Sequence, residues 1–347
     1  MAMDDEPARL NRARGGDSAA FSSLMRSYER EIVTHCYRML GSLADAEDTA
    51  QETWVRAWSR LSTFEGRASF RAWVYKIATH ACLDALDSRR ARALPDDLSP
   101  AWDLGVPTPA ASNEPIWLEP IPDALVADGA RGPEARVSAR ESIALAFLVT
   151  IQCLPPRQRA VLLLRDVVGW SAEEVADLLE SSVPSVNSAL QRARESIEHT
   201  PDVDHAARRV STDLDDARTR SLVIRYVRAW ESGDLPGLVE LLASDATVVM
   251  PPVVSWYRGV EAIAGLLRAV AFPADGAKRF RMRESRANGQ PAFATEMSED
   301  GGITWKPQSV HVLDIDGDKI TRMTVFLGEE PTRRLAATLG GSGPDAS

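Results

Sequence analysis

The chain has 347 residues, of which 44% are hydrophobic, and a formal net charge of −10. That length allows two or three domains, each with its own core. The acidic balance excludes a uniformly basic nucleic-acid coat, although an average over the chain can conceal a local basic face. The start of the chain is polar and acidic, unlike a signal peptide, and the most apolar run, residues 143–151, is too short to cross a bilayer. We therefore expect a cytoplasmic protein that does not associate with membranes.

Three cysteines, Cys36, Cys82 and Cys153, lie far apart in the sequence. An odd number at this spacing indicates free, buried thiols in a reducing compartment rather than a disulfide framework. His35 and His80 each lie within two residues of a cysteine, but neither pair has a usual zinc spacing and both fall in apolar helical patterns. We predict core residues at these positions, and neither a metal nor a cofactor.

Residues 9–92 are predicted to form an all-α domain. Apolar residues recur at intervals of three and four in stretches that begin at Phe21, Ile32, Ala50 and Phe70. The helical spacing also predicts that Trp54, Trp58, Phe70 and Trp73 lie largely in the core. Phe64 differs, because it falls in a predicted loop and could be presented to a ligand.

This domain also separates its charges. Residues 56–92 hold eight basic and three acidic side chains among aromatic ones, a combination that can hold and stack an unpaired nucleic-acid strand. Just before them, Asp45, Glu47, Asp48 and Glu52 crowd together. An acidic helix face would repel DNA, so it should meet either a basic protein partner or water.

Residues 93–134 form a predicted linker. Residues 95–134 contain eight prolines, eight acidic residues and one basic residue. Proline disfavours helix and the like charges repel, so the segment should be extended. Its one strong apolar patch, Ile116-Trp117-Leu118, is expected to dock on a folded part of the chain. Helical patterns resume over residues 135–200.

Residues 154–198 have the pattern of a helix-turn-helix. Ser171 and Glu174 have capping-box spacing before a short helix, Glu180-Ser181 breaks it, and Ser182 can cap a second helix. The polar face of that second helix can pair with base edges or phosphates through Ser185, Asn187, Ser188, Gln191, Arg192 and Arg194. An ordinary helical hairpin with a solvated face has the same pattern, so the residues alone leave both interpretations open.

Residues 217–332 are predicted to form an α+β domain, followed by a flexible tail over 333–347. Helical patterns around Tyr226 and over 235–242 and 260–270 precede strand-like runs over 278–287, 291–297, 308–315 and 319–326. Asn288-Gly289 and Asp316-Gly317 indicate tight hairpins, since a type I′ turn needs positive φ at both central residues.

Three segments in order resemble the extracytoplasmic-function (ECF) sigma factors of the sigma-70 family. DAEDTAQETWVRAW (residues 45–58) is similar to the region 2 helix that binds the clamp helices of the RNA polymerase β′ subunit. FEGRASFRAWVYKIATHACLDALDSRR (residues 64–90) is similar to the part that opens and reads the −10 promoter element. LPPRQRAVLLLRDVVGWSAEEVADLLESSVPSVNSALQRARESI (residues 154–197) resembles region 4, which reads the −35 element.

The resemblance covers about residues 9–92 and 135–200 and implies two partners, promoter DNA and the RNA polymerase core, the latter through the β′ clamp helices and the β flap. It places Asp45, Asp48, Gln51 and Glu52 at the polymerase, and Phe64, Arg67, Arg71, Lys76 and His80 at the −10 element. Phe64 and His80 would surround a flipped base. The acidic linker would pass through the active-site channel of the polymerase. Glu180, where the family often has a turn glycine, and His80, where a small or amide residue is usual, leave the promoter sequence open.

The C-terminal segment resembles SnoaL-like domains of the NTF2 fold that are fused to sigma factors. The similar motifs are MPP (residues 250–252), WYRG (256–259) and NGQPA (288–292). The resemblance implies a cone with a pocket, which relatives use for ligands or for isomerase-type catalysis. Tyr226, Trp230, Trp256, Trp305 and His311 could line that pocket or belong to the core. No acid–base pair can be assigned, so no catalytic residue is predicted.

The expected fold class is therefore multidomain, with two all-α domains (sigma region 2 and the helix-turn-helix region 4) and a C-terminal α+β NTF2-like cone. The leading hypothesis is an ECF-type sigma factor, not an enzyme, that directs RNA polymerase to specific promoters and helps to melt the −10 element. Its SnoaL-like domain would modulate activity in cis, through a small-molecule ligand. The alternatives are an enzyme or ligand-binding protein of the SnoaL-like fold with a DNA-binding appendage, and a helix-turn-helix repressor that does not meet polymerase.

Overall fold

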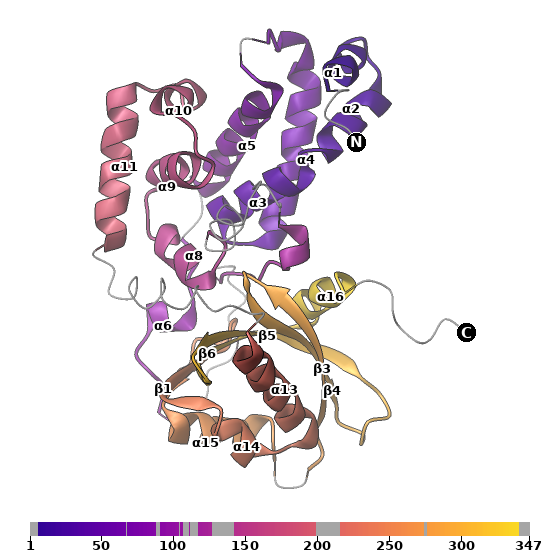
Figure 1. Ribbon diagram of the computed structural model, residues 1–347, viewed down its shortest axis with the longest axis vertical. Coiled ribbons are helices and arrows are strands. Elements are labelled where there is room, and N and C mark those ends of the chain that lie inside the picture. Colours follow the sequence, from indigo (N-terminus) through magenta and orange to yellow (C-terminus); the bar gives the residue numbers. More distant parts are fainter. Residues whose placement is uncertain are drawn as a thin grey trace. The chain divides into compact units, whose positions relative to one another are not determined.

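The computed structural model (Figure 1) describes residues 6–66, 68–87, 91–103, 105–106, 111, 117–126, 142–198, 216–273 and 276–339. These residues form two compact units, a helical unit and an α+β unit. The helical unit contains the described residues up to 91, residues 125–126 and 142, and residues 150–198, so both helical modules belong to it. The α+β unit contains the described residues of 92–124, residues 143–149, and the chain from 216 onward. In the described part of the chain, no helix combines the length and apolar character that a bilayer crossing requires.

The first module of the helical unit contains α1 (Glu6–Arg14), α2 (Ser18–Arg26), α3 (Glu29–Leu40), α4 (Leu43–Arg60), the 3₁₀ turn η1 (Leu61–Thr63) and α5 (Phe70–Leu86). The four predicted helices are confirmed, and side chains cap three of them. Asp17, Ser42 and Ser69 accept hydrogen bonds from the backbone of the first turn of α2, α4 and α5. Gly41, with φ at 71°, ends α3 in the left-handed conformation that glycine adopts without strain.

The second module contains the end of α8 (Leu145–Gln152), whose residues up to 149 belong to the α+β unit. It continues with α9 (Pro156–Leu162), the π-helical turn η3 (Leu163–Val167), α10 (Ala172–Leu178) and α11 (Val183–Glu198). The predicted capping box is present, because Ser171 and Glu174 each accept a hydrogen bond from the other's backbone N–H. Arg159 joins this module to the first. Its guanidinium is buried and donates to the carbonyl oxygens of Met39, Gln152 and Leu154.

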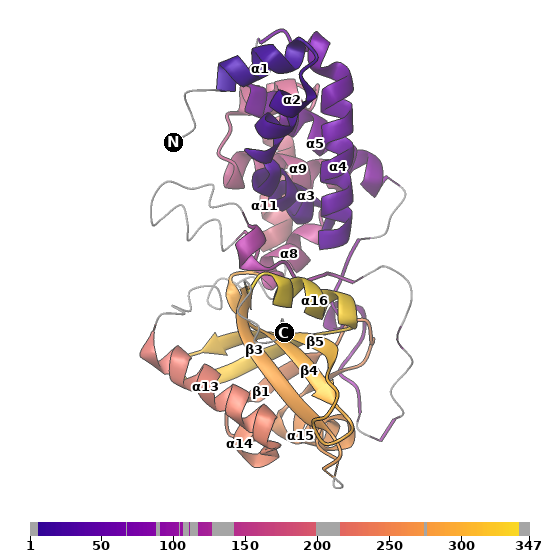
Figure 2. The same cartoon turned by 90° about the vertical axis from the view of Figure 1, so that its right-hand side faces the viewer.

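The α+β unit contains two short turns from the linker, α6 (Pro95–Leu98) and η2 (Asp123–Leu125), with α13 (Ala217–Ser232), α14 (Leu235–Val239), α15 (Val260–Val270) and α16 (Glu329–Ala337). Its strands are β1 (Leu242–Val249), β2 (Trp256–Arg258), β3 (Arg279–Ala287), β4 (Gln290–Ser298), β5 (Lys306–Asp316) and β6 (Lys319–Leu327). They form one sheet in the order β2-β1-β6-β5-β4-β3, in which only β1 and β6 pair in parallel. The curved sheet wraps around α13, α14 and α15, and α16 packs on β3, β4 and β5 (Figure 2).

The core of this unit lies between the sheet and the three helices. Phe293 on β4, Leu313 on β5 and Met323 on β6 meet Tyr226 and Ile263 there. Side chains alternate across a strand, so Met323 and Val325 of β6 both point into this space, and a register shift between β5 and β6 brings Ile320 into it as well. The expected α+β cone is confirmed.

Several predicted boundaries were wrong. The helix predicted over 235–242 ends at Val239, and β1 follows, because Thr247, Val248 and Val249 pair with β6. The predicted start of a flexible tail at residue 333 falls inside α16, which continues to Ala337 and buries Leu335. The hairpin at Asn288-Gly289 is confirmed, with φ at 56° and 73°.

The second hairpin turns one residue later than predicted. Asp316 pairs with Lys319, so Gly317 and Asp318 form the turn between β5 and β6. Of these two residues only Gly317 has positive φ. The turn is therefore not of type I′.

Candidate functional site

The second helix of the helix-turn-helix, α11, presents the predicted polar face to solvent. Val186, Leu190 and Ala193 are buried on its inner side. All six predicted contact residues, Ser185, Asn187, Ser188, Gln191, Arg192 and Arg194, are exposed. The two arginines differ in the intramolecular hydrogen bonds that they would have to break to bind DNA. Arg192 donates only within its own helix, to Ser188 Oγ at 2.9 Å, whereas Arg194 makes two hydrogen bonds, of 3.0 and 2.7 Å, to the carboxylate of Asp166.

The turn before α11 contains a strained residue. Glu180 has φ at 51°, in the left-handed region that residues other than glycine rarely adopt. Its Oε1 lies 3.0 Å from Nζ of Lys76, and Lys76 also reaches the carbonyl oxygen of Asp177 at 3.4 Å. The Lys76 ammonium holds the pKa of the Glu180 carboxyl below its usual value. A side chain predicted to touch the −10 element is thus paired with the helix-turn-helix.

The remaining residues predicted for the −10 element are less accessible than expected. Phe64 is 6% exposed, with its ring against Phe70 and Trp73, so in this conformation little of the ring is open to a ligand, and its role at the −10 element stays a prediction. Arg67 lies outside the described residues. The predicted burial of Trp58 was also wrong: it is 40% exposed, although its ring contacts Phe21.

Arg71 and His80 make intramolecular contacts. Arg71 donates to the Glu31 carboxylate, and its guanidinium lies over the rings of Tyr75, at 5.0 Å, and Trp170, at 5.6 Å. Nδ1 of the half-buried His80 lies 2.8 Å from the carbonyl oxygen of Lys76. In this conformation the charged groups of α5 are engaged within the helical unit.

The acidic face of α4 is more exposed to solvent than the charged groups of α5. Asp48, Gln51 and Glu52 are exposed and Asp45 is half-buried. Glu52 pairs with Arg56 one turn later, with the two closest atoms 2.6 Å apart. These side chains lie on consecutive turns of one helix, as a docking face requires.

Described residues of the linker are hydrogen-bonded to the β3–β4 hairpin. Asn288, at the tip of the β3–β4 hairpin, is fully buried and contacts both the linker and the residues that precede α8. Its backbone N–H donates to the Ile121 carbonyl and its Oδ1 accepts from the Ile121 N–H, while its Nδ2 donates to the Ile143 carbonyl. Asp123 accepts from Gly289 N–H at 2.8 Å and from Arg286 Nε at 3.2 Å. We call these contacts the hairpin clasp.

The apolar patch at residues 116–118 is predicted to dock on a folded part of the chain, and its described side chains are buried. Trp117 and Leu118 are both buried, and Ile116 lies outside the described residues. Arg92 donates to the carbonyl oxygen of Trp117 at 2.7 Å, and Leu118 N–H donates to the carbonyl oxygen of Ala93. The two ends of the linker segment 92–118 therefore pair with each other in the α+β unit.

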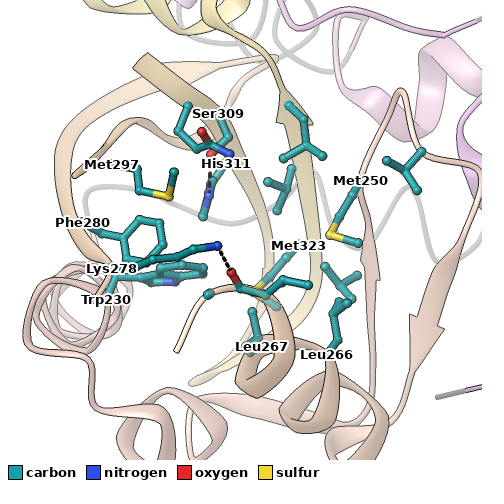
Figure 3. A pocket seen from close by; sticks show the side chains of 17 residues that line it. Trp230, Met250, Leu266, Leu267, Lys278, Phe280, Met297, Ser309, His311 and Met323 are labelled. Atoms are coloured by element: carbon teal, nitrogen blue, oxygen red, sulfur yellow. Dashed lines mark hydrogen bonds between the residues drawn. The ribbon is translucent and has the colours of Figure 1, made fainter. Parts of the chain in front are cut away.

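A pocket of about 290 Å³ lies between the sheet and α15 (Figure 3). Apolar side chains dominate its lining: Trp230, Val248, Met250, Val253, Leu266, Leu267, Val270, Ala271, Phe280, Met297, Met323, Val325 and Leu327. The described lining contains four polar residues, Lys278, Gln308, Ser309 and His311, and no carboxylate. Lys278 Nζ donates to the carbonyl oxygen of Val270 at 2.7 Å.

His311 links the pocket to the core behind it. Its Nδ1 lies 2.8 Å from the Tyr226 hydroxyl and its Nε2 lies 3.0 Å from Ser309 Oγ. Burial lowers the pKa of His311 to about 3 and raises the pKa of Tyr226 far above its usual value, so both are neutral near pH 7. A neutral imidazole with no carboxylate beside it is poorly suited to acid–base catalysis.

The five predicted pocket residues divide into three groups. Trp230 and His311 line the pocket, and Tyr226 contacts it through His311. Trp256 instead donates from Nε1 to the carbonyl oxygen of Ser99, and Trp305 stacks with Arg281 on the outside of the sheet. Sequence analysis missed the aliphatic lining, although the alternation of Met323, Val325 and Leu327 along β6 was a usable signal.

The cysteines are free, as predicted, but only Cys36 and Cys82 are buried, and Cys153 is exposed. Among the described residues, no three His, Cys, Asp or Glu side chains are grouped to hold a metal ion.

Comparisons with known proteins cover most of the chain. Residues 24–92 match the model of sigma-70 region 2, residues 144–197 that of sigma-70 region 4, and residues 223–323 that of the SnoaL-like domain. The ECF RNA polymerase sigma factor SigG of Mycobacterium tuberculosis is 43% identical over 320 residues, which cover 90% of this chain and 82% of SigG. SigW of Bacillus subtilis is 29% identical over 189 residues, or 54% of this chain and 92% of SigW.

Among solved structures, the ECF sigma factor SigJ of Mycobacterium tuberculosis matches with a TM-score of 0.56 and 22% identity, over 90% of this chain and 98% of SigJ. That likeness shows a shared fold. The sequence identity to SigG, together with the matches to regions 2 and 4, goes further. The chain belongs to the ECF sigma factors of the sigma-70 family, which are transcription factors and not enzymes, and it carries a C-terminal SnoaL-like domain.

Proposed function

We propose that this sigma factor directs core RNA polymerase to specific promoters and that its SnoaL-like domain modulates this activity in cis by holding the linker. Membership of the ECF family supports the first part. The exposed acidic face of α4 would dock on the polymerase, and the polar face of α11 would read the −35 element. Arg71, Lys76 and His80 would act at the −10 element after leaving their intramolecular partners.

The hairpin clasp is the observation that supports cis modulation. One residue of the SnoaL-like domain, Asn288, is hydrogen-bonded to the linker at Ile121 and to Ile143, two residues before α8. A linker held in this way is unavailable for the channel of the polymerase that the resemblance assigns to it. Docking on the α+β unit and docking in the polymerase therefore compete, and the docked state is the less active one.

The experiment is in vitro transcription with purified core polymerase, at promoters identified by mapping the start sites that the chain directs. The test variant is Asn288→Gly in the full chain. Glycine tolerates the positive φ of this position, so the substitution removes the two side-chain hydrogen bonds without straining the turn. Each lost bond should shift the docking equilibrium by about fivefold, and transcript yield should rise.

A matched control is Asp318→Ala at the tip of the other hairpin, where the side chain is exposed. Its transcript yield should equal that of the parent. Truncation after Thr200 should raise the yield at least as much as Asn288→Gly. Unchanged yields in both Asn288→Gly and the truncated chain would rule out cis modulation, and an absence of any directed transcript would rule out the sigma activity itself.

A further inference from the structure

We propose that the pocket binds an uncharged, mainly apolar small molecule that carries one hydrogen-bond-accepting oxygen, and that the bound molecule strengthens the docking of linker residues 96–102 on the α+β unit. This inference rests on the proposed function only for its effect on transcription. Binding and docking are properties of the chain alone and can be measured without polymerase.

The lining determines the chemical class of the ligand. About 290 Å³ of space bounded by Leu, Val, Met, Phe and Trp side chains favours an apolar body of small-molecule size. No described lining residue carries a negative charge, so a cationic ligand would lose its hydration without gaining an ion pair. Lys278 is half-buried, and one N–H of its ammonium donates to the Val270 carbonyl oxygen in an exposed hydrogen bond, so water can solvate the rest of its charge and an anion is not required.

The Tyr226–His311–Ser309 chain determines where the oxygen would lie. A neutral imidazole has one N–H. We assign the Tyr226 hydroxyl hydrogen to the contact with Nδ1, which at 2.8 Å is much shorter than the contact with Met323 Sδ at 3.8 Å. In this tautomer Nε2 carries the imidazole hydrogen and donates to Ser309 Oγ. The Ser309 hydroxyl hydrogen then points to no other described partner, and this residue lines the pocket. A ligand carbonyl could accept from it.

The linker docks on the other side of the same wall. Asp96 forms a two-point ion pair with Arg322 on β6, with one N–O distance of 2.8 Å, and the next residue, Met323, lines the pocket. Burial alone would lower the pKa of Arg322, but Asp96 raises it above its ordinary value, so Arg322 keeps its charge. Successive side chains of a strand lie on opposite faces, so β6 has the linker on one face and the pocket on the other.

The segment that follows β1 provides a second shared wall. Val253 lines the pocket, and the carbonyl oxygen of its neighbour Val254 accepts from Ser99 Oγ at 3.3 Å. Trp256 Nε1 donates to the Ser99 carbonyl at 2.8 Å, and Trp102 N–H donates to the Trp256 carbonyl at 2.7 Å. The Trp102 side chain packs against the same core cluster that borders the pocket.

These contacts give the coupling its direction. An apolar cavity leaves its lining atoms without packing partners on one side, and a bound molecule supplies them. The ligand therefore stabilises Met323 and Val253 in the positions that the docked linker requires. By linkage, a docked linker raises ligand affinity by the same factor by which the ligand favours docking. In the proposed mechanism the ligand would lower transcription.

The test uses prodan, an uncharged naphthalene with one ketone whose emission depends on polarity, and the full-length chain. Prodan should bind one site saturably with blue-shifted emission, and Leu267→Trp, which fills the pocket, should weaken binding at least tenfold. Ser309→Ala should weaken it several-fold and shift the emission further to the blue, because the ketone loses its donor. If Leu267→Trp does not fold, Ala271→Phe replaces it.

The coupling is tested with Asp96→Ala and Trp102→Ala, with Asp103→Ala, an exposed neighbour, as the matched control. Prodan affinity should fall at least fivefold in the first two variants and stay unchanged in the control. Hydrogen exchange at residues 96–102 of the parent chain should slow when prodan is bound.

Three results would overturn the inference. The first is absence of prodan binding, or equal binding to the filled-pocket variants. The second is at least tenfold tighter binding of the anionic anilinonaphthalene sulfonate, which would make the ligand an anion held at Lys278. The third is equal affinity in all linker variants, which would leave a pocket without coupling. A transcription assay that fails while these results hold would contradict the proposed function alone.

Discussion

Helix α11 and the pocket of the α+β unit are the two surfaces for which we propose binding roles, and their side chains have opposite character. On α11 the outward-facing groups are polar, exposed and contributed by one helix of sixteen residues. In the pocket the lining groups are mostly apolar and contributed by α13, α15 and several strands. The exposed side chains of α11 can be removed without loss of the fold. The apolar side chains that line the pocket also belong to the core and stabilise the fold. Mutations should therefore separate binding from stability on α11 and combine them in the pocket.

Acidification should produce the largest effect, and it acts on the interior. Burial lowers the pKa of His35 in the helical unit and of His311 in the α+β unit to about 3 each. The unfolded chain takes up these protons near the ordinary pKa of 6.5, so stability is lost as the pH falls below 6.5. Each histidine should reduce the free energy of unfolding by about 2 kcal/mol between pH 7 and pH 5.

Chemical denaturation at the two pH values measures this loss. His311→Gln should flatten the pH dependence by the share of one histidine. If that variant lost stability with acid as steeply as the parent, His311 would not be a buried neutral group.

Arg192→Ala should give the next largest effect, confined to DNA binding. If Arg192 pairs with a guanine of the −35 element, its loss should cost about 1–3 kcal/mol of binding at the matched base and relax discrimination there. Gel-shift titrations with matched and mismatched duplexes measure this. Equal losses on all sequences would make it a phosphate contact.

Arg194→Ala should weaken DNA binding less than Arg192→Ala does. Its guanidinium must first leave Asp166, whose carboxylate it meets with two hydrogen bonds, so the net loss of DNA affinity should be smaller than for Arg192. A larger loss for Arg194 would mean that this pair does not compete with DNA.

Charge reversal on α4 should weaken a different interaction. Asp45→Lys with Asp48→Lys should reduce affinity for core polymerase about tenfold or more, since like charges oppose docking on a basic face. Co-purification and fluorescence anisotropy measure this, with Glu261→Lys on α15 as an exposed control in the other unit. A chain that retains core affinity would place the docking face elsewhere.

Glu180→Gly should have the smallest effect, and it should be stabilising. Glycine relieves the left-handed backbone at φ 51°, by about 1 kcal/mol. The lost ion pair with Lys76 is largely exposed and screened by water, so it contributes less than the strain. Thermal denaturation measures the gain. A destabilised variant would show that the pair with Lys76 matters more than the strain.

Sequence reasoning worked where one element contains its own signal. The capping box of Ser171 and Glu174, the six exposed residues of α11 and the Asn288-Gly289 hairpin all depend on neighbours within a few positions. The periodicity of three and four likewise located α2 to α5. These features follow from local backbone geometry, so a single sequence is enough to find them.

The sequence was a poor guide where contacts between distant segments decide which partner a side chain meets. Trp256 was left open between the pocket and the core, and its partner is Ser99 of the linker. Phe64 falls in a predicted loop from which it could be presented to a ligand, yet its ring lies against Phe70 and Trp73. The linker composition predicted an extended chain, but its acidic residues Asp96 and Asp123 are the ones that meet Arg322 and Arg286. Which partner a charge meets depends on topology, and that information is not local.

The hairpin clasp has a practical consequence for engineering this chain. Ile121 and Ile143 are bound to the same side chain, so the segment between them leaves and returns at one point. The entropy of closing such a loop grows only with the logarithm of its length. A reporter peptide or a protease recognition sequence inserted between residues 127 and 141 should therefore leave the docked ends in place. Cutting there would convert the sigma factor into two fragments that stay associated.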